Sequence, residues 1–393
     1  MPVGYLVTVL LAAVCTVAAL APLRRPGLAA ALSFRLGLVL NEMPFVVCYW
    51  LVASTALAAA QDDLDSPGGW AGFGLAVLTT VGLGVIARRG LRAGPVLERA
   101  LATGLGPGWR DTLDAGRAAR LRRRLPLGRI LLRPMFRRRH DVDRIADLSY
   151  GDAGRRHRLD VYRHRSRPTG GPVLIHLHGG HFEGGRKNTQ SLPLLYRLAS
   201  QGWVCVSANY RLSPAVGFPE HLIDAKRVIA WVREHGHEYG ADPATVFVAG
   251  SSAGGHLAAM SALTPGDPTF QPGFEQVDTS VTAAIGLNGY YGPIDSGGPP
   301  SSPAAYVRPD APSFLVVHGD RDTVALVEGA RSFVDELRAV STGPVVYAEL
   351  PGAQHSFDLF HSLRFERVVD AVEAFAAWVC SRNEATRTPG GTT

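Results

Sequence analysis

The chain has 393 residues, of which 46% are hydrophobic and 19% are charged, a balance that excludes an intrinsically disordered chain. Its formal net charge is +6. Its four cysteines lie far apart in the sequence, so neither a disulfide scaffold nor a zinc site is predicted. It carries no GxxxxGK[ST] phosphate loop, and we therefore predict no metal and no cofactor.

Residues 1–92 form a predicted membrane region. Three apolar stretches are close to the length that crosses about 30 Å of hydrocarbon: residues 3–23, 43–60 and 70–87. A cleaved signal peptide is the alternative for the first stretch, but the basic pair Arg24 and Arg25 follows that stretch instead of preceding it. We therefore predict three transmembrane helices and a multi-pass protein of the cell membrane.

Charges that flank these stretches predict their orientation. Arginines lie on one side of the predicted helices and aspartates on the other: Arg24, Arg25, Arg35, Arg88, Arg89 and Arg92 against Asp62, Asp63 and Asp65. Because positively charged loops stay in the cytoplasm, we expect the N-terminus outside the cell and the chain beyond residue 92 in the cytoplasm. An even number of crossings would invert this topology.

Residues 93–147 form a predicted basic linker. Its arginines are interleaved with leucines and other apolar residues: Arg117, Arg120, Arg122, Arg123, Arg124, Arg129, Arg133, Arg137, Arg138 and Arg139. Such a segment can lie on an anionic leaflet, where each basic residue adds about 1 kcal/mol. Arginine runs also occur in nucleic-acid-binding proteins, but the neighbouring membrane helices favour lipid, so no nucleic-acid partner is predicted.

Residues 148–382 alternate between predicted strands and helices. Strands are expected at residues 173–177, 203–208, 281–287, 313–318 and 345–350, and helices at 219–235 and 364–381. The alternation predicts an α/β domain whose mostly parallel central sheet is flanked by helices. The tail at residues 383–393 is predicted to be disordered.

Residues 249–255 carry a GxSxG pattern between a predicted strand and a predicted helix. A sharp strand-to-helix turn at such a pattern raises the central serine above the sheet as a nucleophile. Ser252 has Gly250 and Gly254 two residues away on either side, where the backbone is crowded. Ser251 would have alanines at those places, so Ser252 is the predicted nucleophile and Ser251 the weaker alternative.

Further motifs offer the partners that such a nucleophile needs. A glycine-rich loop after the strand at 173–177 presents backbone N–H groups, and the predicted oxyanion hole comprises Gly179, Gly180, His181 and Ala253. Asp322 is the predicted carboxylate, with Asp320 as the alternative, and His355 is the predicted base. Other histidines beside strands and motifs are expected to be structural: His178, His256, His318 and His361.

Taken in the order Ser, Asp, His, these motifs resemble those of the α/β-hydrolase carboxylesterases and lipases. The likeness is strongest to hormone-sensitive-lipase-like and HGGxW-type esterases and to membrane-associated lipase/esterase proteins of actinobacteria. It covers roughly residues 148–380 and rests on five short segments: residues 178–181, 209–214, 250–255, 318–322 and 352–357. His181 stands where the lipase motif has a third glycine, and Phe182 where the HGGxW motif has tryptophan.

The resemblance implies an α/β-hydrolase fold and a serine hydrolase that cleaves small-molecule esters through a triad and an acyl-enzyme. Short- to medium-chain, lipophilic carboxylic esters are the expected substrates. An amidase, deacetylase or formamidase on the same fold, or a catalytically inactive membrane scaffold, is the alternative. Related esterases cap their active sites with N-terminal helices, so residues 93–147 could form a cap instead of an interfacial segment. No oligomeric state is predicted.

Overall fold

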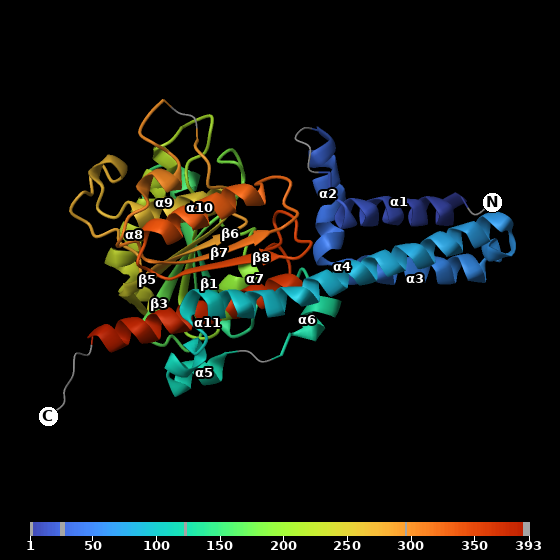
Figure 1. The fold of residues 1–393 in the computed structure, drawn as a ribbon, viewed down its shortest axis with the longest axis horizontal. Helices are drawn as coiled ribbons and strands as arrows, with labels where there is room; N and C mark the ends of the chain where they lie inside the picture. The colour runs from blue at the N-terminus through green and yellow to red at the C-terminus, as the bar shows by residue number, and fades with distance from the viewer. Residues whose placement is uncertain (1–2, 24–27, 122–123, 295–296, 388–393) are drawn as a thin grey trace.

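A mixed β-sheet runs through the centre of the larger part of the molecule (Figure 1). The computed structural model describes residues 3–23, 28–121, 124–294 and 297–387. Within these residues the sheet has eight strands: β1 (Val142–Ser149), β2 (Arg158–His164), β3 (Gly171–Leu177), β4 (Val204–Ala208), β5 (Ala241–Ser251), β6 (Ala283–Leu287), β7 (Ser313–Gly319) and β8 (Val345–Leu350). Their order is β1-β2-β4-β3-β5-β6-β7-β8. The two pairs that involve β2 are antiparallel and the others are parallel, which confirms the mostly parallel sheet.

Apolar residues on both faces of the central strands explain why the sheet is buried. In β3 the consecutive residues Val173, Leu174 and Ile175 are completely inaccessible to solvent. Their side chains alternate between two hydrophobic clusters, one on each face of the sheet. An uninterrupted apolar run is the pattern expected of a parallel strand that is covered on both sides.

Helices cover both faces of the sheet. One face is covered by α8 (Glu220–His235), α9 (Ala253–Leu263) and α10 (Val327–Val340), and the other by α7 (Leu192–Ala199) and α11 (Leu363–Arg387). The second half of the long helix α4 (Pro67–Leu105) also packs on that second face, where Leu97 and Leu101 are buried. The described residues also contain short 3-10 helices: Asp63–Asp65, Trp109–Thr112, Gly154–His157, Gly236–Tyr239, Pro268–Phe270 and Pro303–Tyr306.

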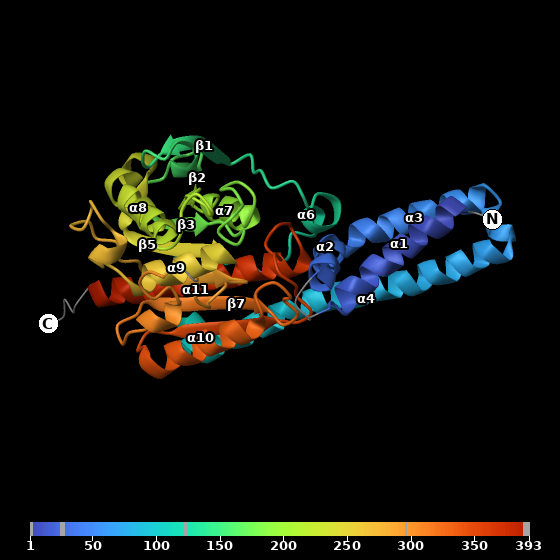
Figure 2. The ribbon, with the colours of Figure 1, turned by 90° about the horizontal axis from the view of Figure 1, so that it is seen from above.

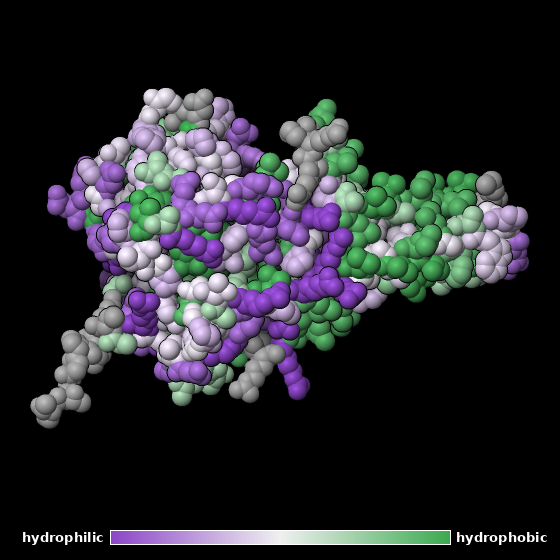
Figure 3. All heavy atoms as spheres, viewed as in Figure 1, coloured by the Kyte–Doolittle hydropathy of each residue, from purple (hydrophilic) through white to green (hydrophobic). Residues whose placement is uncertain are grey.

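An apolar helical bundle projects from this α/β unit (Figures 1 and 2). It consists of α1 (Val3–Leu20), α3 (Pro44–Ala60) and the first half of α4. Figure 3 shows hydrophobic side chains over the surface of the bundle and hydrophilic ones at its tip. Among the described residues, α1 and α4 are each long and apolar enough to cross a membrane, and α3 with the preceding helix α2 (Leu28–Glu42) makes a third candidate.

Helix α2 occupies the stretch between the first two predicted transmembrane helices, where a loop is expected. The α2 and α3 axes are bent by 86° at the break between them, so α2 lies across the end of the bundle. Its residue Gly37 approaches the backbone of Ala19 so closely that an added Cβ would lie 3.2 Å from it. This close packing against α1 explains why the segment is helical despite its charged and polar residues.

Three predicted boundaries differ from the structure. Helix α4 continues through residue 92 and ends at Leu105, because its second half packs on α11 and β8. The sheet begins at Val142 rather than at residue 148. Helix α11 extends through residues 383–387, which were predicted to be disordered, because Glu384 forms a 2.5 Å ion pair with Arg117. The remaining tail, residues 388–393, lies outside the described residues.

The predicted basic linker is divided between two places. Helix α5 (Ala115–Arg120) packs near the C-terminal end of α11, away from the bundle, and Arg117 is paired there with Asp114 and Glu384. This part of the linker therefore does not lie beside the apolar bundle. Helix α6 (Leu127–Leu132) does lie near the end of the bundle (Figures 1 and 2). Arg122 and Arg123 lie outside the described residues.

Candidate active site

Ser252 lies at the sharp turn between β5 and α9. Its backbone has φ 54° and ψ −118°, a conformation that non-glycine residues rarely adopt. A Cβ on Gly250 would lie 2.0 Å from the carbonyl oxygen of Gly254, and a Cβ on Gly254 would lie 2.0 Å from that of Leu177. Only glycine fits at either position, so the two glycines of the motif allow this strained turn.

The neighbouring Ser251 points away from the solvent side of this turn. Its side chain is completely buried, and its hydroxyl donates to Oδ2 of Asp358 at 2.5 Å. His176 and Ser191 approach the same hydroxyl at 3.2 and 3.3 Å. Ser251 therefore belongs to a buried polar network behind the turn, whereas Ser252 faces a cavity.

Asp322 and His355 are brought together although 33 positions separate them. His355 Nδ1 and Asp322 Oδ2 lie 2.7 Å apart, in loops at the carboxyl ends of β7 and β8. The backbone N–H groups of Val324 and Ala325 donate to Oδ1 of Asp322. Burial alone raises the pKa of Asp322, but the charge of His355 and hydrogen bonds from His318 and His355 hold that pKa well below its usual range.

Gln354 joins the two loops that carry this pair. Its Oε1 accepts hydrogen bonds from the N–H groups of Thr323 and His355, each at 2.8 Å, and its Nε2 donates to Oγ1 of Thr323. The alternative carboxylate, Asp320, instead accepts the N–H of Gly352 at 2.7 Å. Asp320 thus supports the loop before His355, while Asp322 contacts the imidazole.

The glycine-rich loop after β3 approaches Ser252 closely. A Cβ on Gly179 would lie 2.7 Å from the Cβ of Ser252, so the loop can pass here only because residue 179 is glycine. The N–H of Gly179, however, donates to Oε1 of Gln190 at 2.6 Å. This hydrogen bond corrects the prediction that Gly179 contributes an N–H to an oxyanion hole.

The other three predicted donors remain available. Among the described residues, no hydrogen bond engages the N–H groups of Gly180, His181 or Ala253. Gly180 and His181 have positive φ angles of 129° and 55°, so the loop turns sharply beside Ser252. Ala253 is the first residue of α9, where an N–H group has no partner within the helix.

Tyr210 and His178 support the glycine-rich loop from behind. The Tyr210 hydroxyl donates to the carbonyl oxygen of His178 at 2.7 Å, and the two rings are stacked with centroids 4.4 Å apart. Burial lowers the pKa of His178 to about 4 and that of His256 to about 4, so both rings are neutral at neutral pH. Their hydrogen bonds to the carbonyl oxygens of Gly179 and Ser301 fit the structural role expected of them.

Ser252 and His355 line one cavity of about 610 Å³. Helix α2 supplies part of its wall, and the cavity's residues are Ala30, Ala31, Phe34, Arg35, Gly179, Gly180, His181, Gly185, Thr189, Gln190, Ser252, Thr323, Val324, His355, Ser356 and Leu359. The Phe34 ring meets the imidazole of His355 edge-on, with centroids 6.1 Å apart. The helix that lines this cavity is α2, and none of residues 93–147, for which a cap was one of two alternatives, is among the lining residues.

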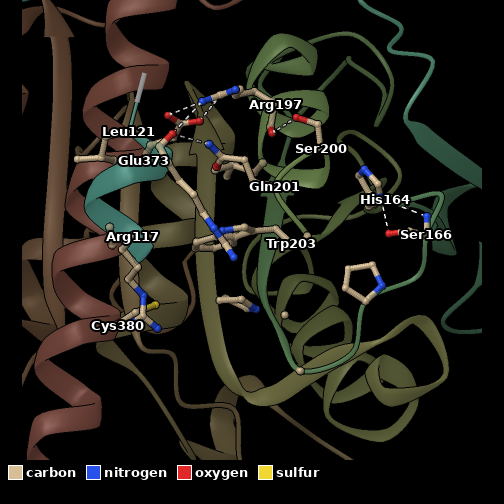
Figure 4. A pocket seen from close by; sticks show the side chains of 18 of the residues that line it. Arg117, Leu121, His164, Ser166, Arg197, Ser200, Gln201, Trp203, Glu373 and Cys380 are labelled. Carbon is tan, nitrogen blue, oxygen red and sulfur yellow. Dashed lines mark hydrogen bonds and ion pairs between the residues drawn. The ribbon is translucent and has the colours of Figure 1, made fainter. Parts of the chain in front are cut away.

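A second cavity, of about 660 Å³, lies elsewhere in the molecule, between α5, α7 and α11 (Figure 4). Two of its three arginines form ion pairs: Arg197 with Glu373, and Arg117 with Glu384. It contains none of the predicted catalytic residues. Within the described parts of the chain, no cluster of three histidine, cysteine or carboxylate side chains is arranged to hold a metal ion.

Sequence reasoning missed several residues that shape this site. Gln190, Gln354 and Asp358 are buried or half-buried polar residues that fix the loops around Ser252 and His355. Phe34 and Arg35 of α2 lie more than two hundred residues from the serine, in a stretch without a catalytic motif. Only the position of Asp358, just after the His355 motif, offered a signal.

A strained serine turn after the fifth strand, with an Asp–His pair after the next strands of a mostly parallel sheet, defines an α/β-hydrolase fold. Solved esterases share it. Thermogutta terrifontis esterase 2 with bound propionate is 24% identical, with a TM-score of 0.51 over 60% of this chain and 93% of that one. A truncated carbohydrate esterase from gut microbiota is 21% identical, with a TM-score of 0.51 over 60% of this chain and 96% of that one.

Sequence comparisons place the chain more narrowly. The family profile described as BD-FAE matches residues 159–297. A Mycobacterium tuberculosis protein described as probable carboxylic ester hydrolase LipM is 39% identical over 420 residues, which cover 99% of this chain and 96% of the relative. Esterase LipQ of the same organism is 37% identical, and the aligned region covers 75% of this chain and 77% of LipQ. The chain belongs to the α/β-hydrolase family of esterases and lipases, and it is a carboxylic ester hydrolase.

Proposed function

We propose that this protein is a membrane-anchored serine carboxylesterase that cleaves short- to medium-chain, lipophilic carboxylic esters. Ser252 is the nucleophile, His355 the general base and acid, and Asp322 the carboxylate that orients the imidazole. The observation that carries the proposal is the 2.7 Å contact between His355 and Asp322 beside the cavity that Ser252 enters from its strained turn.

The chemistry proceeds in two acyl-transfer steps. His355 Nε2 removes the proton from Ser252 as its Oγ attacks the ester carbonyl carbon, and then delivers that proton to the departing alcohol oxygen. A water molecule, deprotonated by the same imidazole, then attacks the acyl carbon; the bond between that carbon and Ser252 Oγ breaks, the imidazolium returns the proton to Oγ, and the acid is released. The hydrogen bond between Ser252 and His355 forms as substrate binds, because such contacts tighten only in the reacting complex.

Asp322 keeps the imidazole in the working tautomer. Its Oδ2 accepts the proton on Nδ1, which leaves Nε2 free to take the serine proton. The carboxylate also stabilises the imidazolium that forms during each step. Since the pKa of Asp322 is held well below its usual range, the group stays charged throughout.

The N–H groups of Gly180, His181 and Ala253 stabilise the negative charge that develops on the carbonyl oxygen. The loop bearing Gly180 and His181 lies beside Ser252, and Ala253 follows it directly. Each donor of this kind is worth about 2.7–4 kcal/mol of transition-state stabilisation. His181 serves through its backbone, so the absence of a third glycine does not remove a donor.

The helical bundle anchors the enzyme in a membrane. Acidic residues occupy the connection between α3 and α4, namely Asp62, Asp63 and Asp65, while Arg88 and Arg89 lie on α4, where Arg89 contacts Gly352 of the α/β unit. By the positive-inside rule this charge asymmetry supports a cytoplasmic catalytic domain and a tip that lies outside the cell. The membrane is therefore a partner through the bundle, and the basic stretch around α6 contributes at its surface.

The cavity sets the expected size of the acyl group. A volume of about 610 Å³ suits a drug-sized ligand, and Phe34 lines it beside the imidazole. Such a space accepts short and medium acyl chains more readily than long ones. Apolar side chains of α2 in its wall favour lipophilic esters.

A panel of p-nitrophenyl esters from acetyl to palmitoyl tests this proposal with the purified full-length protein. We expect turnover to peak at short to medium chains and to fall by on the order of a millionfold in Ser252→Ala. Ser251→Ala is the matched control and should keep most of the activity. Hydrolysis that survives Ser252→Ala and disappears in Ser251→Ala would transfer the nucleophilic role to the neighbouring serine. Matched p-nitroanilide substrates separate esterase from amidase activity.

A further inference from the structure

Helix α2 has the orientation of a helix that lies in the plane of a membrane surface. Its axis is bent by 86° from that of α3, which follows the long direction of the bundle. If the bundle crosses the bilayer, α2 runs parallel to the bilayer plane. Figures 1 and 2 both place α2 at the junction between the bundle and the α/β unit.

The two sides of α2 have different surroundings. Ala30, Ala31 and Phe34 contribute to the wall of the catalytic cavity. Along the other side lie Leu28, Leu32 and Val39, which are 91%, 58% and 39% exposed. Their spacing of four and seven residues places them on one stripe of the helix. Arg35, which is also exposed, lies on this stripe between Leu32 and Val39, so the exposed side of α2 combines apolar residues with one basic residue, as in helices that lie at a lipid surface.

Two arginines meet at the end of α1, beside the loop that carries Asp322. Arg89 of α4 donates to the carbonyl oxygen of Leu20, the last residue of α1, at 2.9 Å. Arg321, which precedes the catalytic Asp322, donates to the same oxygen at 3.4 Å. Arginines at the ends of spanning helices extend toward the headgroups. If the bundle crosses the bilayer, the headgroup level therefore lies next to these arginines and the loop that carries Asp322.

A second apolar patch lies near the same junction between the bundle and the α/β unit, on and after α6. Leu132, Met135 and Phe136 are 76%, 62% and 57% exposed. The carbonyl oxygen of Pro134, between them, accepts the N–H of His361, which ties this segment to the loop that follows His355. Exposed leucine, methionine and phenylalanine among arginines are typical of segments that insert into the headgroup region.

We propose that the catalytic cavity is filled directly from the bilayer, with α2 seated in the lipid surface as its wall. The substrates would be esters dissolved in the membrane, whose lipophilic alcohol part stays among the lipids while the acyl group reaches Ser252. The occupant of the exposed α2 stripe is the lipid surface itself. This inference rests on the proposed function, membrane anchoring included, and it adds the route and the physical state of the substrate.

The test uses full-length protein in phospholipid vesicles and two butyrate esters of the same hydroxycoumarin. One coumarin carries a long alkyl chain that holds it in the bilayer, and the other carries a carboxylate that keeps it in water. The measured quantity is the ratio of the two hydrolysis rates. Leu32→Glu places a charge on the exposed α2 stripe without touching the cavity lining. Val340→Glu, at an equally apolar exposed site at the distal end of α10, is the matched control.

We expect Leu32→Glu to lower the ratio by about tenfold, because a charge is costly in the lipid surface. The rate on the water-soluble ester should stay near the wild-type value, and Val340→Glu should leave the ratio unchanged. An unchanged ratio in Leu32→Glu would overturn the inference. Leu32→Gln provides the same comparison if the charged variant does not fold.

A measurement on the wild type alone gives a second, independent test. Diluting the lipid-held ester with more phospholipid, at constant total ester, should slow hydrolysis in proportion to the ester's mole fraction in the bilayer. A hydrolysis rate that stays constant as phospholipid is added would overturn the inference. Hydrolysis of the water-soluble ester alone would refute bilayer loading and leave the proposed esterase intact, whereas hydrolysis of neither ester would refute the proposed function.

Discussion

At the scale of single residues, the Asp–His contact is the most informative feature of the site. Asp322 receives two backbone N–H groups on one oxygen and the imidazole on the other, so its position and its charge are both fixed. An asparagine there would keep the shape and lose the charge. It could also present its amide N–H to Nδ1 and so force the wrong imidazole tautomer.

We therefore expect Asp322→Asn to lower kcat on p-nitrophenyl butyrate by about ten-thousandfold. The matched control is Asp320→Asn, because Asp320 accepts a loop N–H that an asparagine oxygen could also accept. That variant should keep its activity within about tenfold of the wild type. If the two variants lose activity in the reverse order, Asp320 is the catalytic carboxylate.

Buried histidines predict how stability depends on pH. Burial lowers the pKa of His256 from its ordinary 6.5 to about 4. Between these values the unfolded chain binds a proton that the folded protein does not, so stability is present above about pH 6.5 and is lost as the pH falls toward 4. At about pH 5 this one group costs about 2 kcal/mol, which corresponds to a melting temperature lower by roughly 4–8 °C.

Thermal melting at about pH 7.5 and about pH 5 measures this effect. His256→Gln should show a smaller drop in melting temperature between the two pH values than the wild type. His237→Gln is the control, since that histidine is exposed and should leave the drop unchanged. Equal drops in all three proteins would rule out His256 as a contributor.

The sequence predicted the residues that belong to short motifs and missed those defined only by contacts. Ser252, Asp322 and His355 could be found because each follows a strand in a motif of known spacing. The role of Gly179 was misjudged because its partner, Gln190, lies outside any motif and engages the N–H group through its side chain. A motif indicates which backbone groups are near an oxyanion, but hydrogen-bond partners decide which of them are free.

At the scale of secondary-structure elements, a buried ion pair fastens α2 to the catalytic domain. Glu42, at the end of α2, is paired with Arg364 at the start of α11, and each side chain is 1% exposed. The Ser362 hydroxyl also donates to Glu42 at 2.7 Å. Removing one member of such a pair leaves a buried charge uncompensated, whereas replacing both with apolar residues does not.

Arg364→Met should therefore destabilise the protein by about 3–5 kcal/mol, seen as a lower melting temperature. The double variant Glu42→Met, Arg364→Met should recover most of that loss. For comparison, Arg110→Ala breaks an exposed pair with Glu98 and should cost less than about 1 kcal/mol. A double variant that melts no higher than the single one would contradict this account of the α2 attachment.

Elements with strong periodicity were predicted well, and the helices that join the two parts of the molecule were not. The strands β3, β7 and β8 begin and end within a few residues of their predicted bounds, because uninterrupted apolar runs indicate buried parallel strands. Helix α2 was missed because Arg35, Asn41 and Glu42 interrupt its hydropathy. The buried partner that satisfies Glu42, Arg364, is far away in sequence, so tertiary contacts decide this helix.

At the scale of the whole molecule, α4 joins the apolar bundle to the α/β unit as one continuous helix. Its first half belongs to the apolar bundle, and its second half packs on the central sheet. The sequence suggested a boundary at residue 92 because the composition changes there from apolar to basic. The helix continues because its basic residues occupy one side while Leu97 and Leu101 stay buried on the other.

This arrangement predicts the topology of the protein in a cell. Protease added to inside-out membrane vesicles should destroy the esterase activity, and protease added to right-side-out vesicles should not. A tag at the N-terminus should show the opposite pattern, because the tip of the bundle lies on the other side. Loss of activity in right-side-out vesicles would place the catalytic domain outside.

The central claim is that Ser252 is the residue that becomes acylated. The most direct measurement is peptide mass spectrometry of the full-length protein after reaction with a fluorophosphonate. We predict one phosphonyl adduct, located on Ser252, and none on the same peptide from Ser252→Ala or from protein treated after denaturation. An adduct located on Ser251, or no adduct on active protein, would contradict the account.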